Sequence, residues 1–199
     1  MKKLIWASLA SFQFAFADPA GVTQLNGLLQ NFQNLQAHFS ETVQNSQGQA
    51  APSQGTLAIQ KPNQFNWHVL TPNEEWYISD GHQVWNVEPD LDQVTITPLS
   101  RNLSTTPLLL LGGEVQDLSR LFTVTAVDQE DYVLVPKDSQ SLIKQITLHF
   151  DSTGVIQALD IVNTLGQRSH LQFSQVKLNG VLPASLFHYT IPAGMDVLS

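Results

Sequence analysis

The sequence contains no cysteine at any of its 199 positions. This absence excludes disulfide bonds, thiolate metal sites and cysteine nucleophiles together. It does not exclude export to an oxidising compartment, because a domain of this size can be stable without disulfides.

Basic residues are scarce: nine Lys and Arg stand against 17 Asp and Glu, for a formal net charge of −8. The basic residues are also dispersed along the chain, and an acidic chain does not attract nucleic acid. We therefore expect no nucleic-acid partner. Hydrophobic residues make up 42% of the chain, which is enough for a folded core and argues against disorder.

Long apolar runs are missing except at the N-terminus. Two lysines precede a nearly uncharged, mostly apolar stretch over residues 4–16, and Ala15-Phe16-Ala17 has the small-x-small pattern of a signal-peptidase site. The stretch is shorter than the roughly 20 apolar residues that a spanning helix needs. We expect residues 1–17 to be a cleaved signal peptide and residues 18–199, beginning with Asp18, to form a single exported domain.

Catalytic and metal-binding motifs are missing as well. The sequence has no phosphate-binding G-x-x-x-x-G-K-[ST] loop and no G-x-S-x-G nucleophile motif. We therefore expect no enzyme activity, no cofactor and no metal site. The histidines are scattered and never fall four residues apart, as metal-binding pairs on a helix would: His38, His68, His82, His149, His170 and His188.

The chain after Asp18 begins with a helical period. Apolar residues recur every three or four positions, which predicts an amphipathic helix starting near Pro19. The residues of this apolar face are Val22, Leu25, Leu28, Leu29, Phe32 and Leu35.

Beyond the helix the period changes to two, as in strands. Residues 37–43 alternate between apolar and polar, the polar stretch 44–54 is expected to be a loop, and Asp80-Gly81 predicts a hairpin turn. About eleven short strands predict an antiparallel barrel or sandwich. The further strand-like runs are residues 55–60, 64–70, 75–79, 83–87, 93–97, 122–127, 132–135, 143–150, 155–162, 168–177 and 187–191.

One segment interrupts the strands. Residues 106–113 read Thr-Pro-Leu-Leu-Leu-Leu-Gly-Gly, in which proline can open a short helix and glycine can close it. Four consecutive leucines cannot all face one side of a helix. The pattern fits a buried helix that plugs a barrel and fits equally a movable helix that covers an apolar cavity.

Residues 55–98 carry a specific order of features. They are Gly55, Lys61-Pro62, Phe65 and Trp67, Ser79-Asp80-Gly81, Trp85, and Asp92-Gln93-Val94-Thr95. In this order and spacing, and with the first helix, the leucine segment and the C-terminal end, the chain resembles the periplasmic outer-membrane lipoprotein carrier family, LolA. The missing lipidation cysteine fits this soluble family and does not fit its lipidated outer-membrane receptor, LolB.

The resemblance implies a fold and a function. The fold would be mainly β with helices, an unclosed antiparallel β-barrel of about eleven strands covered by an α-helical lid. The protein would work in the periplasm, and we expect a monomer. It would accept acylated lipoproteins from an inner-membrane ABC-type exporter and pass them to LolB.

The resemblance also implies roles for particular residues. Phe65 and Trp67 lie two apart, hence on one face of a strand, and would line the lipid cavity with Trp85. Leu108, Leu109, Leu110 and Leu111 would form the lid face. Lys61 stands where the family usually has Arg, and it would donate hydrogen bonds to lid carbonyls. Read without the resemblance, the aromatic residues are ordinary barrel core and Lys61 is a solvated charge beside a turn.

Two other functions remain open at this stage. The same fold could bind free lipid or another apolar ligand, or act as a sensor domain. A periplasmic hydrolase would need a nucleophile and a base, which the sequence does not offer in a known motif.

Overall fold

A computed structural model describes residues 19–99, 109–112 and 118–199. In these residues twelve strands form one sheet in the order β12-β6-β5-β4-β3-β2-β1-β11-β10-β9-β8-β7. The elements are α1 (Pro19–Gln30), β1 (Asn34–Gln44), β2 (Ala50–Gln60), β3 (Gln64–Thr71), β4 (Glu75–Asp80), β5 (Gln83–Glu88), η1 (Pro89–Leu91), β6 (Gln93–Pro98), α2 (Leu109–Gly112), α3 (Leu118–Leu121), β7 (Phe122–Ala126), β8 (Asp131–Pro136), β9 (Ile143–Phe150), β10 (Ile156–Asn163), β11 (Arg168–Leu178), η4 (Ala184–Phe187) and β12 (Asp196–Leu198).

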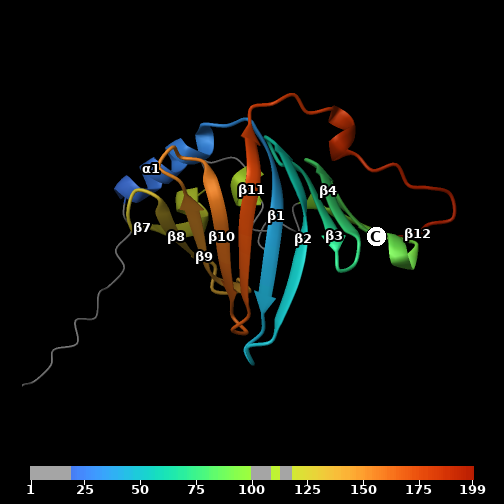
Figure 1. Cartoon of the computed structure of the whole chain (residues 1–199), viewed down its shortest axis with the longest axis horizontal. Coiled ribbons are helices and arrows are strands. Elements are labelled where there is room, and N and C mark those ends of the chain that lie inside the picture. The colour runs from blue at the N-terminus through green and yellow to red at the C-terminus, as the bar shows by residue number, and fades with distance from the viewer. Residues whose placement is uncertain (1–18, 100–108, 113–117) are drawn as a thin grey trace, which may run out of the picture.

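The sheet is unclosed, because its end strands β12 and β7 do not pair with each other. Every neighbouring pair is antiparallel except β12 with β6, which is parallel. The sheet's middle joins distant parts of the chain, since β1 pairs with β11 (Figure 1). The predicted unclosed, mainly antiparallel architecture is therefore confirmed, with twelve strands where about eleven were expected.

The turn between β4 and β5 follows the chemistry of its residues. Gly81 has a φ of +96°, which a residue without Cβ adopts at little cost. The Asp80 carboxylate accepts hydrogen bonds from the backbone N–H groups of His82 and Gln83, at 2.8 and 3.0 Å. The predicted hairpin at Asp80-Gly81 is confirmed.

Helices cover one face of the sheet, which we call the inner face. Apolar side chains of α1 (Leu25, Leu29), α2 (Leu111) and α3 (Leu118) belong to the same buried cluster as side chains from most of the strands. We call this set the inner cluster. Among the helices formed by the described residues, none has the length and apolar character that a membrane crossing requires.

The opposite, outer face carries a second buried cluster on β4, β5 and β6. This outer cluster consists of Ile78, Trp85, Val87 and Val94. The C-terminal segment packs against it through Tyr189, Ile191 and Met195. In Figure 1 this segment leaves the end of β11 and runs past β4 to β12 at the far edge.

Two predicted boundaries are wrong. The first helix ends at Gln30, so Phe32 lies beyond it and Leu35 is in β1. Leu35 fits the helical period only by coincidence, because it is the first residue of β1 whose side chain packs on the inner face. The stretch 44–54 is mostly strand: the β1–β2 ladder extends to Gln44 paired with Ala50, since antiparallel pairing satisfies backbone groups even where side chains are polar.

The strand expected at residues 187–191 is also absent. Phe187 ends the 3₁₀ helix η4, and its side chain is buried in the structure. The chain pairs with the sheet only later, where β12 adds to β6 and the Asp196 N–H donates to the Asp92 carbonyl at 2.8 Å.

Candidate functional site

Phe65 and Trp67 lie on the inner face, as their spacing predicts. Both are in β3 and belong to the inner cluster, with 2% and 7% of their surface exposed. Trp67 stacks on Phe39 of β1, with ring centroids 3.7 Å apart and planes 19° apart. Such a pair adds about 0.5–1.5 kcal/mol to the stability that burial provides. The two residues are therefore part of the apolar inner face.

Gly55 makes room for this aromatic pair. It lies in β2 directly opposite Phe39. A Cβ placed on Gly55 would be 1.9 Å from the carbonyl oxygen of His68 and 2.8 Å from the Phe39 ring. Only a residue without a side chain fits between these strands.

Leucines of the short helices complete the inner face. Leu111 is fully buried in the inner cluster, and Leu110 packs against it half-buried. Leu108 lies outside the described residues, as does the side chain of Leu109. The structure thus brings two of the four predicted lid leucines to the surface that holds Phe65 and Trp67.

Trp85 is a predicted site residue that lies on the other face of the sheet. Its neighbour Val84 is in the inner cluster, and adjacent residues of a strand point to opposite faces. Trp85 accordingly belongs to the outer cluster, where its ring meets His188 edge-on at a centroid distance of 5.1 Å. The prediction that Trp85 shares a cavity with Phe65 and Trp67 is wrong.

Lys61 donates to backbone carbonyls of a helix end, but at α1 instead of the predicted leucine segment. Its ammonium donates to the carbonyl of Leu29 and, at 3.0 Å, to that of Phe32. The Leu29 carbonyl lies in the last turn of α1, where carbonyls have no partner within the helix, and Phe32 lies two residues beyond that end. The Nζ atom also lies 3.7 Å from the centroid of the Phe32 ring. Burial lowers the pKa of Lys61 to about 8.

The turn that carries Lys61 contacts α2 as well. The backbone N–H of Asn63 donates to the carbonyl of Gly112, the last residue of α2, at 2.8 Å. Asn63 is held in turn by Ser79, whose fully buried hydroxyl donates to the Asn63 carbonyl at 2.9 Å. The β2–β3 turn, residues 61–63, therefore contacts two of the three α-helices that the structure describes, and we call it the helix-holding turn.

A carboxylate limits the apolar part of the inner face. Glu41 lies two residues beyond Phe39 in β1 and so shares its face. Burial raises the pKa of Glu41, while hydrogen bonds from Ser169 and Ser53 act in the opposite direction. The inner surface is thus apolar around Phe65 and becomes polar toward the β1–β2 hairpin.

The outer face carries an open hollow with polar and charged side chains in its lining. An open hollow of about 440 Å³ lies over β9, β10 and β11, and its lining includes Thr147, Asp160, Arg168 and His170. Among the described residues, no group of three or more His, Asp or Glu side chains is arranged to hold a metal ion.

Several contributors to the site escaped sequence reasoning. In the sequence, Phe39 is one residue of the alternating run 37–43, and Phe32 is part of the predicted helix face. Neither has a local signal, because the partners of Phe39 and Phe32, Trp67 and Lys61, lie about 30 residues away along the chain. Ser79 does have a signal, since it begins the Ser79-Asp80-Gly81 motif, but its role depends on a turn of another hairpin.

Comparisons with known proteins agree with this geometry. The family model described as outer membrane lipoprotein carrier protein LolA matches residues 30–190. An outer-membrane lipoprotein carrier protein of Pseudomonas fluorescens is 38% identical over 188 residues, covering 92% of this chain and 90% of the relative. The protein of the same name from Hahella chejuensis is 37% identical over 206 residues, covering 100% and 98%.

A solved structure supports the fold alone. A LolA superfamily protein from Nitrosomonas europaea superposes with a TM-score of 0.52 at 11% identity, covering 88% of this chain and 99% of that one. Together with the sequence matches over nearly the whole chain, the unclosed sheet and the helix-covered inner face lead to one conclusion: the chain belongs to the outer membrane lipoprotein carrier family LolA.

Proposed function

We propose that the protein is a periplasmic carrier that holds the acyl chains of lipoproteins between its helices and the inner face. One observation carries the proposal: leucines from α1, α2 and α3 lie in the same buried cluster as Phe65 and Trp67. Helix side chains thus occupy the surface that acyl chains would occupy. The proposed donor is an inner-membrane ABC-type exporter, and the proposed acceptor is LolB.

The magnitude of acyl burial explains why a covered site suits a carrier. Burying one CH₂ is worth about 0.8 kcal/mol, so a chain of about 16 carbons contributes ~13 kcal/mol. Three such chains would exceed the practical limit of about 20 kcal/mol for non-covalent binding. If acyl chains displace leucines that are already buried, only the difference between the two sets of contacts counts. Cargo can then be released to an acceptor of higher affinity.

The helix-holding turn is the proposed control of this exchange. It contacts α1 through Lys61, which donates to the Leu29 carbonyl, and α2 through the backbone N–H of Asn63, which donates to the Gly112 carbonyl. Breaking a few polar contacts at one turn would free two helices from the sheet. The inner surface would then open without loss of any strand pairing.

The experiment is transfer of a radiolabelled lipoprotein from spheroplasts into a soluble complex with the protein. Phe65→Glu should abolish capture, because a carboxylate among apolar side chains costs several kcal/mol or draws water into the site. Leu70→Glu is the matched control: it places the same charge on the same strand, at a side chain that is 46% exposed. Full capture by folded Phe65→Glu would place the acyl chains elsewhere.

Extraction of the material that copurifies with the protein separates the carrier from its main alternative. Covalently acylated protein in the extract supports the proposal. Free lipid without lipoprotein, together with failure of the transfer assay, would assign the same inner face to a general apolar-ligand binder.

A further inference from the structure

Three exposed leucines, one at a helix end and two in loops, lie at the same end of neighbouring strands. They are Leu121 at the end of α3, Leu142 before β9 and Leu165 between β10 and β11, with 45%, 66% and 83% of their surface exposed. Because neighbouring strands are antiparallel, the start of β7, the β8–β9 loop and the β10–β11 loop lie at the same end of the strands. In Figure 1 this is the lower end of β8 to β11.

Backbone hydrogen bonds join these loops into one surface. The Lys137 N–H donates to the Leu121 carbonyl, and the Thr164 N–H donates to the Leu142 carbonyl, both at 2.9 Å. We call the surface formed by residues 120–121, 137–144 and 163–168 the rim surface.

Leu142 and Leu165 are exposed on ordered turns. The Asn163 side-chain oxygen accepts from the backbone N–H groups of Leu165 and Gln167, at 3.0 and 2.9 Å. In the β8–β9 loop the Asp138 carboxylate accepts from the Gln140 N–H at 2.9 Å. Local side-chain bonds of this kind fix turns, so the loops hold their apolar tips outward.

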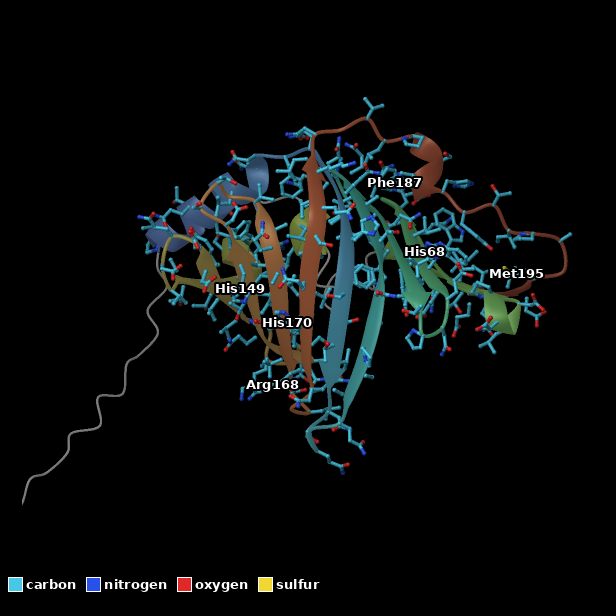
Figure 2. The ribbon with its side chains drawn as sticks, in the orientation of Figure 1. His68, His149, Arg168, His170, Phe187 and Met195 are labelled. Atoms are coloured by element: carbon cyan, nitrogen blue, oxygen red, sulfur yellow. The ribbon has the colours of Figure 1, made fainter. Side chains whose placement is uncertain are left out.

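Basic side chains gather on the same surface. Of the six Lys and Arg in the described residues, four are on the rim surface, all exposed: Arg120, Lys137, Lys144 and Arg168. Asp138 is its only acidic residue. Figure 2 shows Arg168 at the lower end of β11. This concentration stands out in a chain with a net charge of −8.

The turns at the other end of the same strands carry the opposite charge. The β7–β8 and β9–β10 turns and their flanks carry Asp128, Glu130, Asp131 and Asp151 and no Lys or Arg. The protein therefore has an electrostatic polarity along β7 to β10, with its basic end at the rim surface. An anionic surface would attract the molecule and orient it with the leucines forward.

We propose that the rim surface docks on the anionic phospholipid surface of a membrane. Leucines on protruding turns would enter the boundary between headgroups and acyl chains, while the flanking cations would pair with phosphates. A protein helix or peptide would instead need a groove or a continuous stripe, whereas these leucines stand on three separate segments, the end of α3 and two loops. The inference concerns the protein without cargo and does not depend on what fills the inner face.

The test is sedimentation of the cargo-free protein, from Asp18 onward, with vesicles of phosphatidylethanolamine and phosphatidylglycerol. Binding should be weak, reversible and reduced by salt, and it should be absent with phosphatidylcholine vesicles. A Lys144→Glu/Arg168→Glu variant should bind at least about 25-fold more weakly, because each basic residue near an anionic surface contributes roughly a fivefold change. A Leu142→Ser/Leu165→Ser variant should lose binding even at low salt.

Leu91→Ser is the matched control, since Leu91 is 63% exposed but lies in η1 on the other half of the sheet. Its vesicle binding should equal that of the unaltered protein. Equal sedimentation of the rim variants and the unaltered protein would overturn the proposal. So would a lack of vesicle binding combined with loss of lipoprotein transfer in the rim variants, which would assign the surface to a protein partner.

Discussion

Lys61 shows how one side chain can set the balance between a closed and an open inner face. Its ammonium donates to the carbonyls of Leu29 and Phe32 at the end of α1. A hydrogen bond from a charged donor is worth about 1.5–3 kcal/mol, enough to shift a two-state balance tenfold or more. Lys61→Leu should therefore accept lipoprotein but release it poorly, because its lid contacts are already lost. Separate measurement of loading and of transfer to the acceptor tests this.

Lys61→Arg is the conservative counterpart of this substitution. A planar guanidinium offers more donors to the same two carbonyls and stays charged, so cargo should enter less readily and leave more readily. Release by Lys61→Leu at the rate of the unaltered protein would remove Lys61 from the mechanism. The carrier proposal would then rest on Phe65, Trp67 and the helix leucines.

Comparing the unaltered protein with Lys61→Arg also tests a prediction about pH. The pKa of Lys61 is lowered to about 8, so the ammonium loses its charge as the pH rises through that value. The neutral amine is a weaker donor and no longer attracts the Phe32 ring. Uptake of an apolar fluorescent dye should accelerate through this pH window in the unaltered protein and stay flat in Lys61→Arg. Parallel pH profiles of the two proteins would contradict the assignment.

Gly55 tests the packing of the inner face at a single atom. A methyl group there would collide with the His68 carbonyl oxygen and the Phe39 ring. Gly55→Ala should destabilise the protein by about 1–3 kcal/mol or more through overpacking, visible as a lower Tm. Gly27→Ala is the control: nothing lies within 4 Å of its Cβ position, so an exposed helix gains up to about 1 kcal/mol. An unchanged Tm for Gly55→Ala would show that β1 and β3 separate easily.

At the scale of elements, the helices should have to move for cargo to enter. A Cβ on Gly112 of α2 would lie 3.2 Å from a methyl group of Ile59 in β2. The Gly112→Cys/Ile59→Cys variant should therefore form a disulfide that fixes α2 to the sheet, with no native cysteine to compete. The oxidised variant should fail to load lipoprotein, and reduction should restore loading. Loading by the oxidised form would show that α2 stays in place during uptake.

Four strands are joined on the outer face by a chain of side chains. His149 in β9 contacts Asp131 of β8 and Asp160 of β10 through its two ring nitrogens, both at 2.8 Å, and Asp160 also contacts His170 of β11 at 2.6 Å. Figure 2 shows His149 on β9 and His170 on β11, the two strands that flank β10. Two carboxylates can both accept from one imidazole only when both nitrogens carry protons. The geometry therefore requires the charged form of His149.

This chain predicts how stability depends on pH. Burial alone would lower the pKa of His149, but the hydrogen bonds and charges of Asp160 and Asp131 outweigh it and raise the pKa above 6.5. The folded state thus holds a proton that the unfolded state has lost, and stability decreases as the pH rises from 6.5 through the raised pKa. Thermal unfolding of the protein should show this decrease, and His149→Gln should remove it. A decrease of the same size in His149→Gln would assign it to other groups.

At the scale of the whole molecule, the apolar inner face is closed at one end by helices and becomes polar at the other, near Glu41. The basic rim surface and the acidic turns opposite it add a second polarity along β7 to β10. Neither feature belongs to a single element, because each depends on which strand ends and loops the antiparallel sheet brings together.

The N-terminus of the exported protein is also a whole-molecule prediction. Residues 1–17 have the charge, length and small-x-small ending of a signal peptide, so the purified protein should begin at Asp18. Intact mass measurement of protein secreted to the periplasm checks this directly. A mass that includes Met1 would contradict export by cleavage.

The sequence by itself determined most of the strands and the start of the first helix, because periodicity and turn chemistry are local properties, and its order of motifs indicated the family. It placed Phe65 and Trp67 on one face, since two-residue spacing in a strand guarantees that. The tertiary structure alone decided which face Trp85 takes, which carbonyls Lys61 reaches, and where α1 ends. Those outcomes depend on strand register and on packing between segments far apart in the chain, which no local pattern encodes.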